Sequence, residues 1–368
     1  VIGGAGKTPV SLKIGKILIK AGYKPHFISK GYAGIIKEST LVQSWHSSTS
    51  VGDESLLLSE VASTWIGNDR IKSSHLAKKN GADCLIMDDG FQNPSIEKDF
   101  SIIVINGEQE FGNKRVIPSG PLRESITRGL SRTNLVIVIG NINNDLEKLI
   151  PSHIPIFKAN FAIKEGNTIY KGKNVTAFAG IAYPEKFFNS LEKLGAKIVK
   201  RISFSDHHIY NENDLLTLAE NANKTKSILV TTRKDFVRIP KSYRSLINAL
   251  DGEIVFENEE PLSEILSNII EDYIINNQSN YWMKKIKYFT EFIFLYIFFS
   301  LLTIVPINFV SRLGGILFKL IGPYTRHHKI AISNYKKIYC NLNENEINKY
   351  IINSWYNLGK TFVEFSIL

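Results

Sequence analysis

The stretch Gly3-Gly4-Ala5-Gly6-Lys7-Thr8-Pro9 decides the fold, because it joins the apolar pair Val1-Ile2 to a helical pattern that begins at Val10. Glycines at such a turn let backbone N–H groups surround a polyphosphate, and the helix that follows offers its positive end. In this position Lys7 reaches the β and γ phosphates, and the Thr8 hydroxyl can ligate magnesium. The pattern GxxxxGK[ST] has glycine where Val1 stands, so the stretch predicts a variant phosphate-binding loop. A glycine-rich turn without a phosphate is the alternative.

Short apolar runs alternate with helical patterns after this loop. Such alternation is typical of βαβ units and of a parallel sheet. We expect strands at 26–29, 84–87, 101–105 and 135–139, with helices at 10–21 and 54–62. A hinge between Pro151 and Pro155 leads to a second unit with strands at 175–178, 228–230 and 254–256. The sequence therefore predicts an α/β fold with a core at 1–150 and a smaller α/β part at 151–281.

Two acids follow one of the predicted strands, in the run Leu85-Ile86-Met87-Asp88-Asp89-Gly90. The ends of parallel strands meet at one edge of a sheet, so both carboxylates should lie beside the phosphate-binding loop. Phosphoryl transfer requires a magnesium carboxylate at that place. Asp-Gly is also an ordinary turn, and the run by itself leaves both interpretations open. Together with Lys7 and Thr8 it predicts a nucleotide and magnesium site that includes Asp88 and Asp89.

The basic excess of the chain is concentrated in its last quarter. The 368 residues contain 45 Lys and Arg against 35 Asp and Glu, whereas residues 283–368 contain 11 against 4. The two cysteines, Cys84 and Cys340, are far apart and match no zinc or disulfide pattern. A basic surface next to apolar residues favours anionic lipid over nucleic acid, which would need interleaved aromatic and basic residues.

An apolar run of 14 residues occupies positions 292–305 in this basic quarter. A spanning helix needs about 20 apolar residues. Extension over 288–307 would tolerate Glu291 and Pro306, so a membrane-inserted or interfacial helix and a buried core helix both stay open. The basic residues Lys284, Lys285 and Lys287 favour a cytoplasmic approach to anionic headgroups. We expect 283–368 to be a helical, membrane-associated tail.

Further motifs follow the loop along the chain. They are Ser29-Lys30-Gly31-Tyr32, Val51-Gly52-Asp53-Glu54, Asp88-Asp89-Gly90-Phe91-Gln92, Gly120-Pro121-Leu122-Arg123-Glu124, Phe178-Ala179-Gly180-Ile181, Phe204-Ser205-Asp206-His207-His208 and Thr232-Arg233-Lys234-Asp235. Over residues 1 to about 280 this series resembles the tetraacyldisaccharide 4'-kinase family of lipid A biosynthesis. That family commonly lacks the first glycine of the loop, as this chain does, and its chains begin some tens of residues earlier.

The resemblance implies a P-loop NTPase-like kinase that transfers the γ-phosphoryl group of ATP to the 4' hydroxyl of a lipid disaccharide 1-phosphate. It implies that the reaction takes place at the cytoplasmic face of the inner membrane of a Gram-negative bacterium. By position, Gly3 to Thr8 hold the phosphates, and Thr8, Asp88 and Glu124 hold Mg²⁺. Asp53 and His207 would form the dyad that takes the proton from the sugar hydroxyl.

Alternatives exist for each of these residues. Asp53 could instead be the N-cap of the helix that starts at Glu54, and His207 could be a surface residue. Arg123 has the fork that matches phosphate oxygens, but it could also form a surface salt bridge with Glu124. Lys30, Ala33 and Asn93 depart from the family, where arginine, glycine and histidine are usual.

From Met283 onward the chain resembles the start of a lipid A lauroyl or myristoyl acyltransferase. The cues are the basic start, the apolar run, Arg326-His327-His328 and the stretch from Asn353 to Lys360. Such enzymes use HxxxxD or HxxxxE, but Ile332 and Ser333 stand at the acid positions, so we expect no acyl transfer. A GTPase-like binding module is the rival interpretation of the whole chain. For guanine recognition it offers only Thr232-Arg233-Lys234-Asp235.

Overall fold

The computed structural model describes residues 5–163, 167–304, 306–339 and 342–367. The chain forms two compact units, Val1–Tyr273 and Ile274–Leu368, and each is described by itself. The predicted strand remnant Val1-Ile2 and the loop glycines Gly3 and Gly4 lie outside the described residues.

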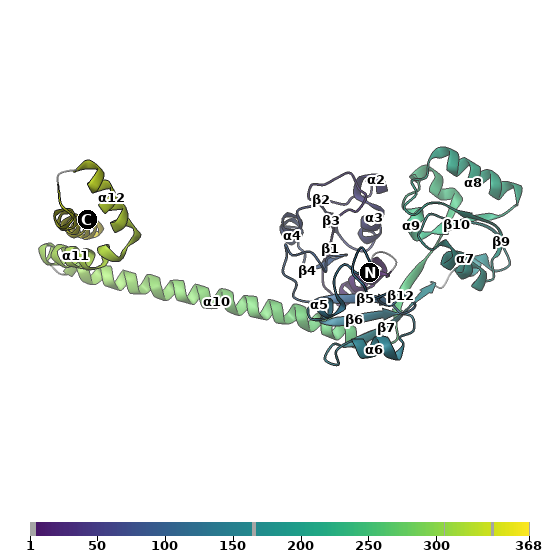
Figure 1. Cartoon of the computed structure of the whole chain (residues 1–368), viewed down its shortest axis with the longest axis horizontal. Helices are drawn as coiled ribbons and strands as arrows, with labels where there is room; N and C mark the ends of the chain where they lie inside the picture. Colours follow the sequence, from purple (N-terminus) through teal and green to yellow (C-terminus); the bar gives the residue numbers. More distant parts are fainter. Residues whose placement is uncertain (1–4, 164–166, 305, 340–341, 368) are drawn as a thin grey trace. The chain divides into compact units, whose positions relative to one another are not determined.

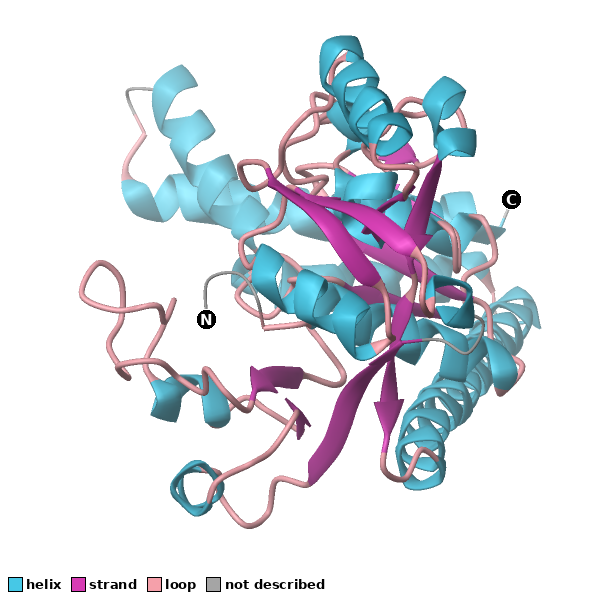
Figure 2. Ribbon diagram, turned by 90° about the vertical axis from the view of Figure 1, so that its right-hand side faces the viewer, coloured by secondary structure: helices cyan, strands magenta, loops and turns pink. Residues whose placement is uncertain are grey.

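In its described part, the first unit contains three four-stranded sheets, whose strands are magenta in Figure 2. We name each sheet after one central strand. The β1 sheet has the order β2 (Thr40–Leu41), β3 (Thr64–Ile66), β1 (Pro25–Ser29) and β4 (Cys84–Met87). The β6 sheet has the order β12 (Gly252–Phe256), β7 (Ile156–Ile163), β6 (Leu135–Ile139) and β5 (Ile102–Asn106). The β8 sheet has the order β11 (Ile247–Leu250), β10 (Ile228–Thr232), β8 (Asn174–Ala179) and β9 (Lys197–Ser203).

The strand pairs are parallel except at two edges, where β2 and β12 run antiparallel to β3 and β7. The α/β prediction is therefore confirmed, although two of the sheets are mixed. The predicted strands at 26–29, 84–87, 101–105 and 135–139 correspond to β1, β4, β5 and β6 within one residue at each end. The predicted hinge between Pro151 and Pro155 lies in the connection between β6 and β7. These two strands are neighbours in the β6 sheet, so the sheet contains residues from both sides of the hinge.

The helices of the first unit lie between these strands along the chain, except α1, which precedes β1, and α10, which follows β12 (Figure 1). They are α1 (Lys7–Lys20), α2 (Ser48–Val51), α3 (Asp53–Ser59), α4 (Arg70–Lys79), α5 (Ile126–Leu130), α6 (Asn144–Leu149), α7 (Pro184–Lys193), α8 (Glu212–Lys224), α9 (Arg233–Phe236) and the start of α10 (Glu260–Ile304). Short 3₁₀ helices occupy Asn167–Tyr170 and Lys241–Leu246.

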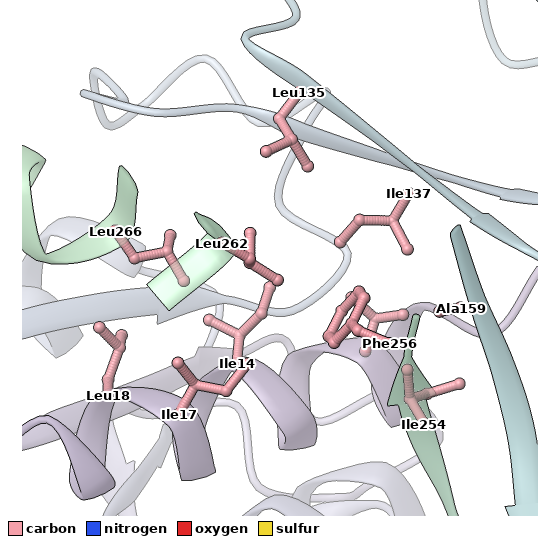
Figure 3. Packing of buried hydrophobic residues seen from close by; sticks show 11 residues of the cluster. Ile14, Ile17, Leu18, Leu135, Ile137, Ala159, Ile254, Phe256, Leu262 and Leu266 are labelled. Atoms are coloured by element: carbon pink, nitrogen blue, oxygen red, sulfur yellow. The ribbon is translucent and has the colours of Figure 1, made fainter. Parts of the chain in front are cut away.

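Helix α1 is the packed support beneath the phosphate-binding loop. Its buried residues Val10, Ile14, Ile17 and Leu18 recur at helical spacing and form one apolar face. Figure 3 shows Ile14, Ile17 and Leu18 pointing toward Leu262 and Leu266 of α10, with Leu135 and Ile137 of β6 in the same cluster. Burial of this face holds the first residues of α1 at the edge of the sheets.

A cavity of about 470 Å³ lies beside α1. Its walls come from α1, β4, β5 and the start of α10, and they are mostly apolar, as at Ile14, Ile86 and Ile102. Strands β4 and β5 are the end strands of the β1 and β6 sheets. They are only partly buried, whereas the inner strand β1 is buried throughout. Lys7 and Asp89 line the polar part of the same cavity.

The second unit contains the rest of α10, together with α11 (Ile307–Ile321), a 3₁₀ turn at Gly322–Tyr324, α12 (Arg326–Ile338) and α13 (Glu344–Ile367). Helices α11 and α13 pack closely, since a Cβ on Gly359 would lie 2.3 Å from the Gly314 carbonyl oxygen. His328 is buried and its Nδ1 accepts a hydrogen bond of 3.1 Å from Trp355 Nε1. His328 therefore has a structural contact in this unit.

Within the described residues, none of the helices combines the length and the apolarity that crossing a membrane requires. The structure describes only some of the side chains of the predicted apolar run at 292–305. Its helical character is confirmed, because α10 continues to Ile304.

Gly52 occupies the tight junction between α2 and α3, with φ 86° and ψ 147°. A Cβ at this position would lie 2.4 Å from the carbonyl oxygen of Tyr32. A backbone oxygen cannot move aside as a flexible side chain can, and the conformation itself is one that glycine alone adopts readily. The junction determines where Asp53, the next residue, begins α3.

We expect Gly52→Ala to lower the free energy of unfolding by about 2–4 kcal/mol, from backbone strain and from the contact with Tyr32. Gly81→Ala is the matched control, because Gly81 also has a positive φ of 84° but has open space at its Cβ. Gly81→Ala should lower the free energy of unfolding by only about 1 kcal/mol. Urea unfolding of both variants measures the difference, and equal costs would contradict the role of the Tyr32 contact.

Candidate active site

The described part of the phosphate-binding loop contacts the two acids that follow β4. Gly6, with φ 84°, precedes α1 and approaches β6 so closely that a Cβ would lie 2.4 Å from Cδ1 of Ile139. Lys7 Nζ is 2.6 Å from Asp89 Oδ1, and Thr8 Oγ1 donates a hydrogen bond of 2.9 Å to Asp88 Oδ2. The structure thus brings together Lys7, Thr8, Asp88 and Asp89, as the sequence predicts.

The two adjacent carboxylates have opposite electrostatic environments. Asp88 is buried, and this burial raises its pKa although Ser11 and Thr8 donate hydrogen bonds to it. Burial acts on Asp89 in the same direction, but hydrogen bonds and charge from Arg123 and Lys7 outweigh it and lower the pKa. A cation next to Asp88 would therefore stabilise the ionised form of its desolvated carboxylate, whereas Asp89 already has two cationic partners.

Arg123 binds Asp89 with both ends of its guanidinium group, at 2.9 Å to each carboxylate oxygen. The alternative of a surface pair with Glu124 is wrong, because the two oxygens of Glu124 accept bonds of 2.7 and 2.8 Å from Arg132. Glu124 also accepts a bond of 2.9 Å from Gln92 Nε2. Arg128 Nε lies 4.0 Å from Glu124 as well, so the structure brings Arg123 to Asp89 and gives Glu124 three other partners.

The oxygen donors at Thr8 and Asp88 fit a magnesium ion. Mg²⁺ is usually held by one or two carboxylates, with phosphate oxygens and water completing six ligands. The Thr8 hydroxyl and the Asp88 carboxylate are in contact, and Asp89 is the next residue. In the part of the chain that the structure describes, no three His, Cys, Asp or Glu side chains form a metal cluster. Phosphate oxygens would therefore have to complete the coordination.

The second predicted constellation, Asp53 with His207, also comes together. His207 Nδ1 is 3.1 Å from Asp53 Oδ2, although the two residues are 154 positions apart. Asp53 is 4% exposed at the first turn of α3, and its Oδ1 accepts a bond from the Glu54 N–H. The N-cap alternative for Asp53 is wrong, because Gly52 occupies the N-cap position of α3.

Arg238 is the residue of this cluster that sequence reasoning misses. Its Nε donates a hydrogen bond of 2.9 Å to Asp53 Oδ2, and its Nη2 donates to the same oxygen. Its Nη1 donates to Asp235 Oδ1 at 3.0 Å and to the Gly180 carbonyl at 2.7 Å. Arg238 and Asp235 are buried almost completely. Burial alone would raise the pKa of Asp53, but the charges of Arg238 and Lys234 lower it.

Asp235 organises the other side of the same network. It accepts hydrogen bonds from the Gly180 N–H and Tyr210 Oη at 3.0 Å each, and from Thr232 Oγ1 at 2.6 Å. A guanine base cannot be read by a carboxylate whose oxygens are occupied in this way. The GTPase-like interpretation of Thr232 to Asp235 is therefore not supported by the geometry.

His207 is held at the surface of the network rather than inside it. Its backbone has φ 59°, its side chain is 30% exposed, and its ring meets the Tyr32 ring edge-on at 5.9 Å. Lys234 Nζ lies 3.3 Å from the outer ring nitrogen, Nε2. His208 faces elsewhere, since it pairs with Asp214 at 2.9 Å and stacks on Phe204.

Glu54 lies between the two constellations. Burial raises its pKa, followed by the negative charges of Asp88 and Asp53, while Lys234 and Lys7 oppose the shift. Its carboxylate is 3.9 Å from Lys234 Nζ. Lys234 Nζ is also 3.9 Å from Asp53 Oδ2, so Glu54 borders the Asp53–His207 group.

We expect Arg238→Met to lower the free energy of unfolding by about 3–5 kcal/mol, because it leaves two buried carboxylates without their cation. Asp53→Asn combined with Arg238→Met should cost less than the sum of the single changes, since the pair is removed together. Denaturant unfolding of the three variants gives the coupling, and strict additivity would contradict the network.

Asp53 should also make stability depend on pH. Its pKa in the folded state is lowered from the ordinary value of 3.8, so its contribution is present above that value and is lost as pH falls through the lower, folded value. The difference in unfolding free energy between the unaltered chain and Asp53→Asn should stay constant above about pH 5 and shrink below about pH 4. Thermal unfolding across this range measures it; a difference that grows on acidification would contradict the shift.

Comparison with known proteins assigns the family. A family model described as tetraacyldisaccharide-1-P 4'-kinase matches residues 1–271. The tetraacyldisaccharide 4'-kinase of Paramagnetospirillum magneticum is 40% identical over 271 residues, which cover 73% of this chain and 83% of that protein. The enzyme of the same name from Rhodospirillum rubrum is 41% identical over 266 residues, covering 71% and 80%.

A solved structure supports the fold. It is described as the "apo" form of LpxK from Aquifex aeolicus in complex with ATP, and it matches 73% of this chain and 85% of its own with a TM-score of 0.59 and 24% identity. The family match covers the P-loop, both acids after β4, and the Asp53, His207 and Arg238 network. The chain therefore belongs to the tetraacyldisaccharide 4'-kinase family, the ATP-dependent lipid sugar kinases of lipid A biosynthesis.

Proposed function

We propose that this chain transfers the γ-phosphoryl group of ATP to the 4' hydroxyl of tetraacyldisaccharide 1-phosphate with two groups of residues in one site. Gly3 to Thr8, with Arg123, bind the phosphates, while Asp53 and His207 act on the hydroxyl. The observation that carries this proposal is the 3.1 Å contact between His207 and Asp53, two residues that are far apart in the sequence.

Lys7 and Arg123 supply positive charge for the phosphates. Both contact Asp89, at 2.6 and 2.9 Å, so an ammonium and a guanidinium group are held next to each other at the start of α1. Charge placed in advance where the transferred group gains negative charge lowers the barrier without later reorganisation. Because the guanidinium fork matches phosphate oxygens, Arg123 is the residue that we assign to the γ-phosphate.

Thr8, Asp88 and Asp89 are the residues that would hold Mg²⁺. When bound, the ion would neutralise charge on the β and γ phosphates. Glu124 would belong to the same metal-binding group. Gln92 connects it to the other residues, because Gln92 Nε2 donates a 2.9 Å bond to Glu124 and Gln92 Oε1 lies 3.4 Å from Arg123 Nη1. The desolvated Asp88 gains most from a cation, because its pKa is raised by burial.

His207 receives the proton of the sugar hydroxyl in this proposal, and Asp53 orients it. The oxygens of Asp53 already accept bonds from Arg238 and from the Glu54 N–H, so its carboxylate is occupied and weakly basic. Since His207 Nδ1 faces Asp53, Nε2, which lies 3.3 Å from Lys234 Nζ, is the nitrogen that would accept the proton. As the sugar oxygen bonds to the γ phosphorus, the bond from phosphorus to the β–γ bridging oxygen breaks and ADP leaves.

The remaining parts of the chain are assigned by resemblance. The part at 151–281 would close the site over the substrate, since it supplies His207 and Arg238 to a cluster that includes Asp53. The lipid substrate and the basic excess after residue 283 support a location at an anionic inner-membrane surface on its cytoplasmic side. Residues 283–368 would correspond to the start of a lipid A acyltransferase without its HxxxxD motif, and His328 is engaged in a structural contact with Trp355.

We expect Asp53→Asn and His207→Gln each to lower kcat by about 10²–10⁴-fold in ATP-dependent phosphorylation of tetraacyldisaccharide 1-phosphate. His207 is 30% exposed, so its replacement should leave thermal unfolding nearly unchanged. The matched control is His208→Gln, because His208 pairs with Asp214 and does not contact Asp53.

The control should keep kcat within about threefold of the unaltered chain, as expected of a histidine outside the reacting groups. If His207→Gln and His208→Gln reduce kcat equally, the assignment of His207 is wrong. If neither Asp53→Asn nor His207→Gln changes kcat, the proposed division of the site into phosphate and proton-transfer groups fails.

A further inference from the structure

Helix α11 of the second unit is apolar on two opposite faces. One face is buried, with Val310, Ser311, Gly314 and Gly315 packed mainly against α13. On the opposite face four large apolar side chains recur at helical spacing and stay 50–64% exposed: Phe309, Leu313, Ile316 and Leu320. At 100° per residue these four lie within about 60° of one another around the helix. The exposed face is thus a continuous stripe and not a set of scattered residues.

The charged Lys and Arg residues of α11 and α12 are not accompanied by any acidic residue on these two helices. The sequence from 292 to 343 contains six Lys and Arg and no Asp or Glu. Arg312 and Lys319 are exposed on one flank of α11, and Arg326 and Lys329 are exposed on α12, which follows. Tyr324, in the turn that follows α11, is 92% exposed. An apolar stripe with basic flanks and an aromatic end is the composition of a helix that lies in a membrane interface.

We propose that α11 lies in the plane of an anionic bilayer, with Phe309, Leu313, Ile316 and Leu320 inserted at the boundary of headgroups and acyl chains. Arg312 and Lys319 then face the phosphate groups of the lipids. This inference deepens the membrane partner proposed above by assigning the contact to α11 instead of the apolar run of α10. It rests on the proposed function only for the biological identity of the membrane.

Charge favours lipid over the other occupants of such a face. A second copy of this unit would place like charges from the 292–343 region against each other, which costs free energy. A nucleic acid would contact basic and aromatic side chains, and the centre of the stripe is aliphatic apart from Phe309. An anionic lipid surface fits both the apolar stripe and its basic neighbours. The acyl chains accommodate the apolar side chains, and the headgroups attract the Lys and Arg side chains.

The test uses the full chain and vesicles of phosphatidylcholine with and without phosphatidylglycerol, with binding read by co-sedimentation. The variant Leu313→Gln/Leu320→Gln should bind phosphatidylglycerol vesicles at least about tenfold more weakly, because two exposed leucines no longer enter the apolar layer. The matched control, Ile209→Gln/Leu216→Gln, changes two apolar residues of similar exposure, 64% and 49%, in the first unit. It should bind as the unaltered chain does.

The basic flank is tested separately. Arg312→Gln/Lys319→Gln should weaken binding by about fivefold per residue, and only to vesicles that contain phosphatidylglycerol. Kinase activity with substrate dispersed in detergent should be unchanged in all these variants. That result separates this inference from the proposed catalytic site.

Vesicle binding that survives in Leu313→Gln/Leu320→Gln would overturn the proposal and assign the contact to another part, such as α10. A variant that binds vesicles normally but loses self-association in light scattering would also overturn it, because the stripe would then be an interface between copies. Both stripe substitutions are at exposed positions, so circular dichroism should show unaltered helix content and exclude misfolding as the cause of weaker binding.

Discussion

The buried guanidinium group of Arg238 is the constraint on which the rest of the site depends. Asp53 and Asp235 are both almost fully buried, and a buried carboxylate is strongly destabilising unless a cation and hydrogen bonds compensate it. Arg238 supplies these to both, and it also binds the Gly180 carbonyl. One side chain therefore joins α3, which lies between β2 and β3 of the β1 sheet along the chain, to the ends of β8 and β10.

This arrangement gives the acids of the site different electrostatic roles. Asp53 and Asp89 have cationic partners that hold their pKa values down, whereas Asp88 and Glu54 have raised pKa values, mainly because of burial. The first pair stays ionised and serves to orient its neighbours. The second pair would gain most from an incoming cation, because a new positive charge stabilises a desolvated carboxylate.

Much of the site could be predicted from short motifs, and the reason is local. Lys7 and Thr8 come directly after a glycine turn, and Asp88 and Asp89 come directly after a strand, so chain geometry alone brings them to one edge. Glu124 could not be placed in this way, because its partner Arg132 follows eight residues later beyond a short helix. Arg238 could not be predicted either, since a basic residue after Arg233 and Lys234 has the same pattern as a solvated loop.

The sequence by itself determined the fold class and the phosphate-binding loop, because each depends on spacing or on a motif within a few residues, whereas the candidate pair Asp53 and His207 came only from the resemblance to the kinase family. It also determined the uneven distribution of charge along the chain. Only the tertiary structure decided that Gly52 and not Asp53 caps α3, that Asp235 is occupied internally, and that Arg238 balances two buried acids. These outcomes depend on contacts between residues that are far apart in the sequence. The same holds for α11, whose pattern allows two apolar faces, while packing against α13 decides which of them stays exposed.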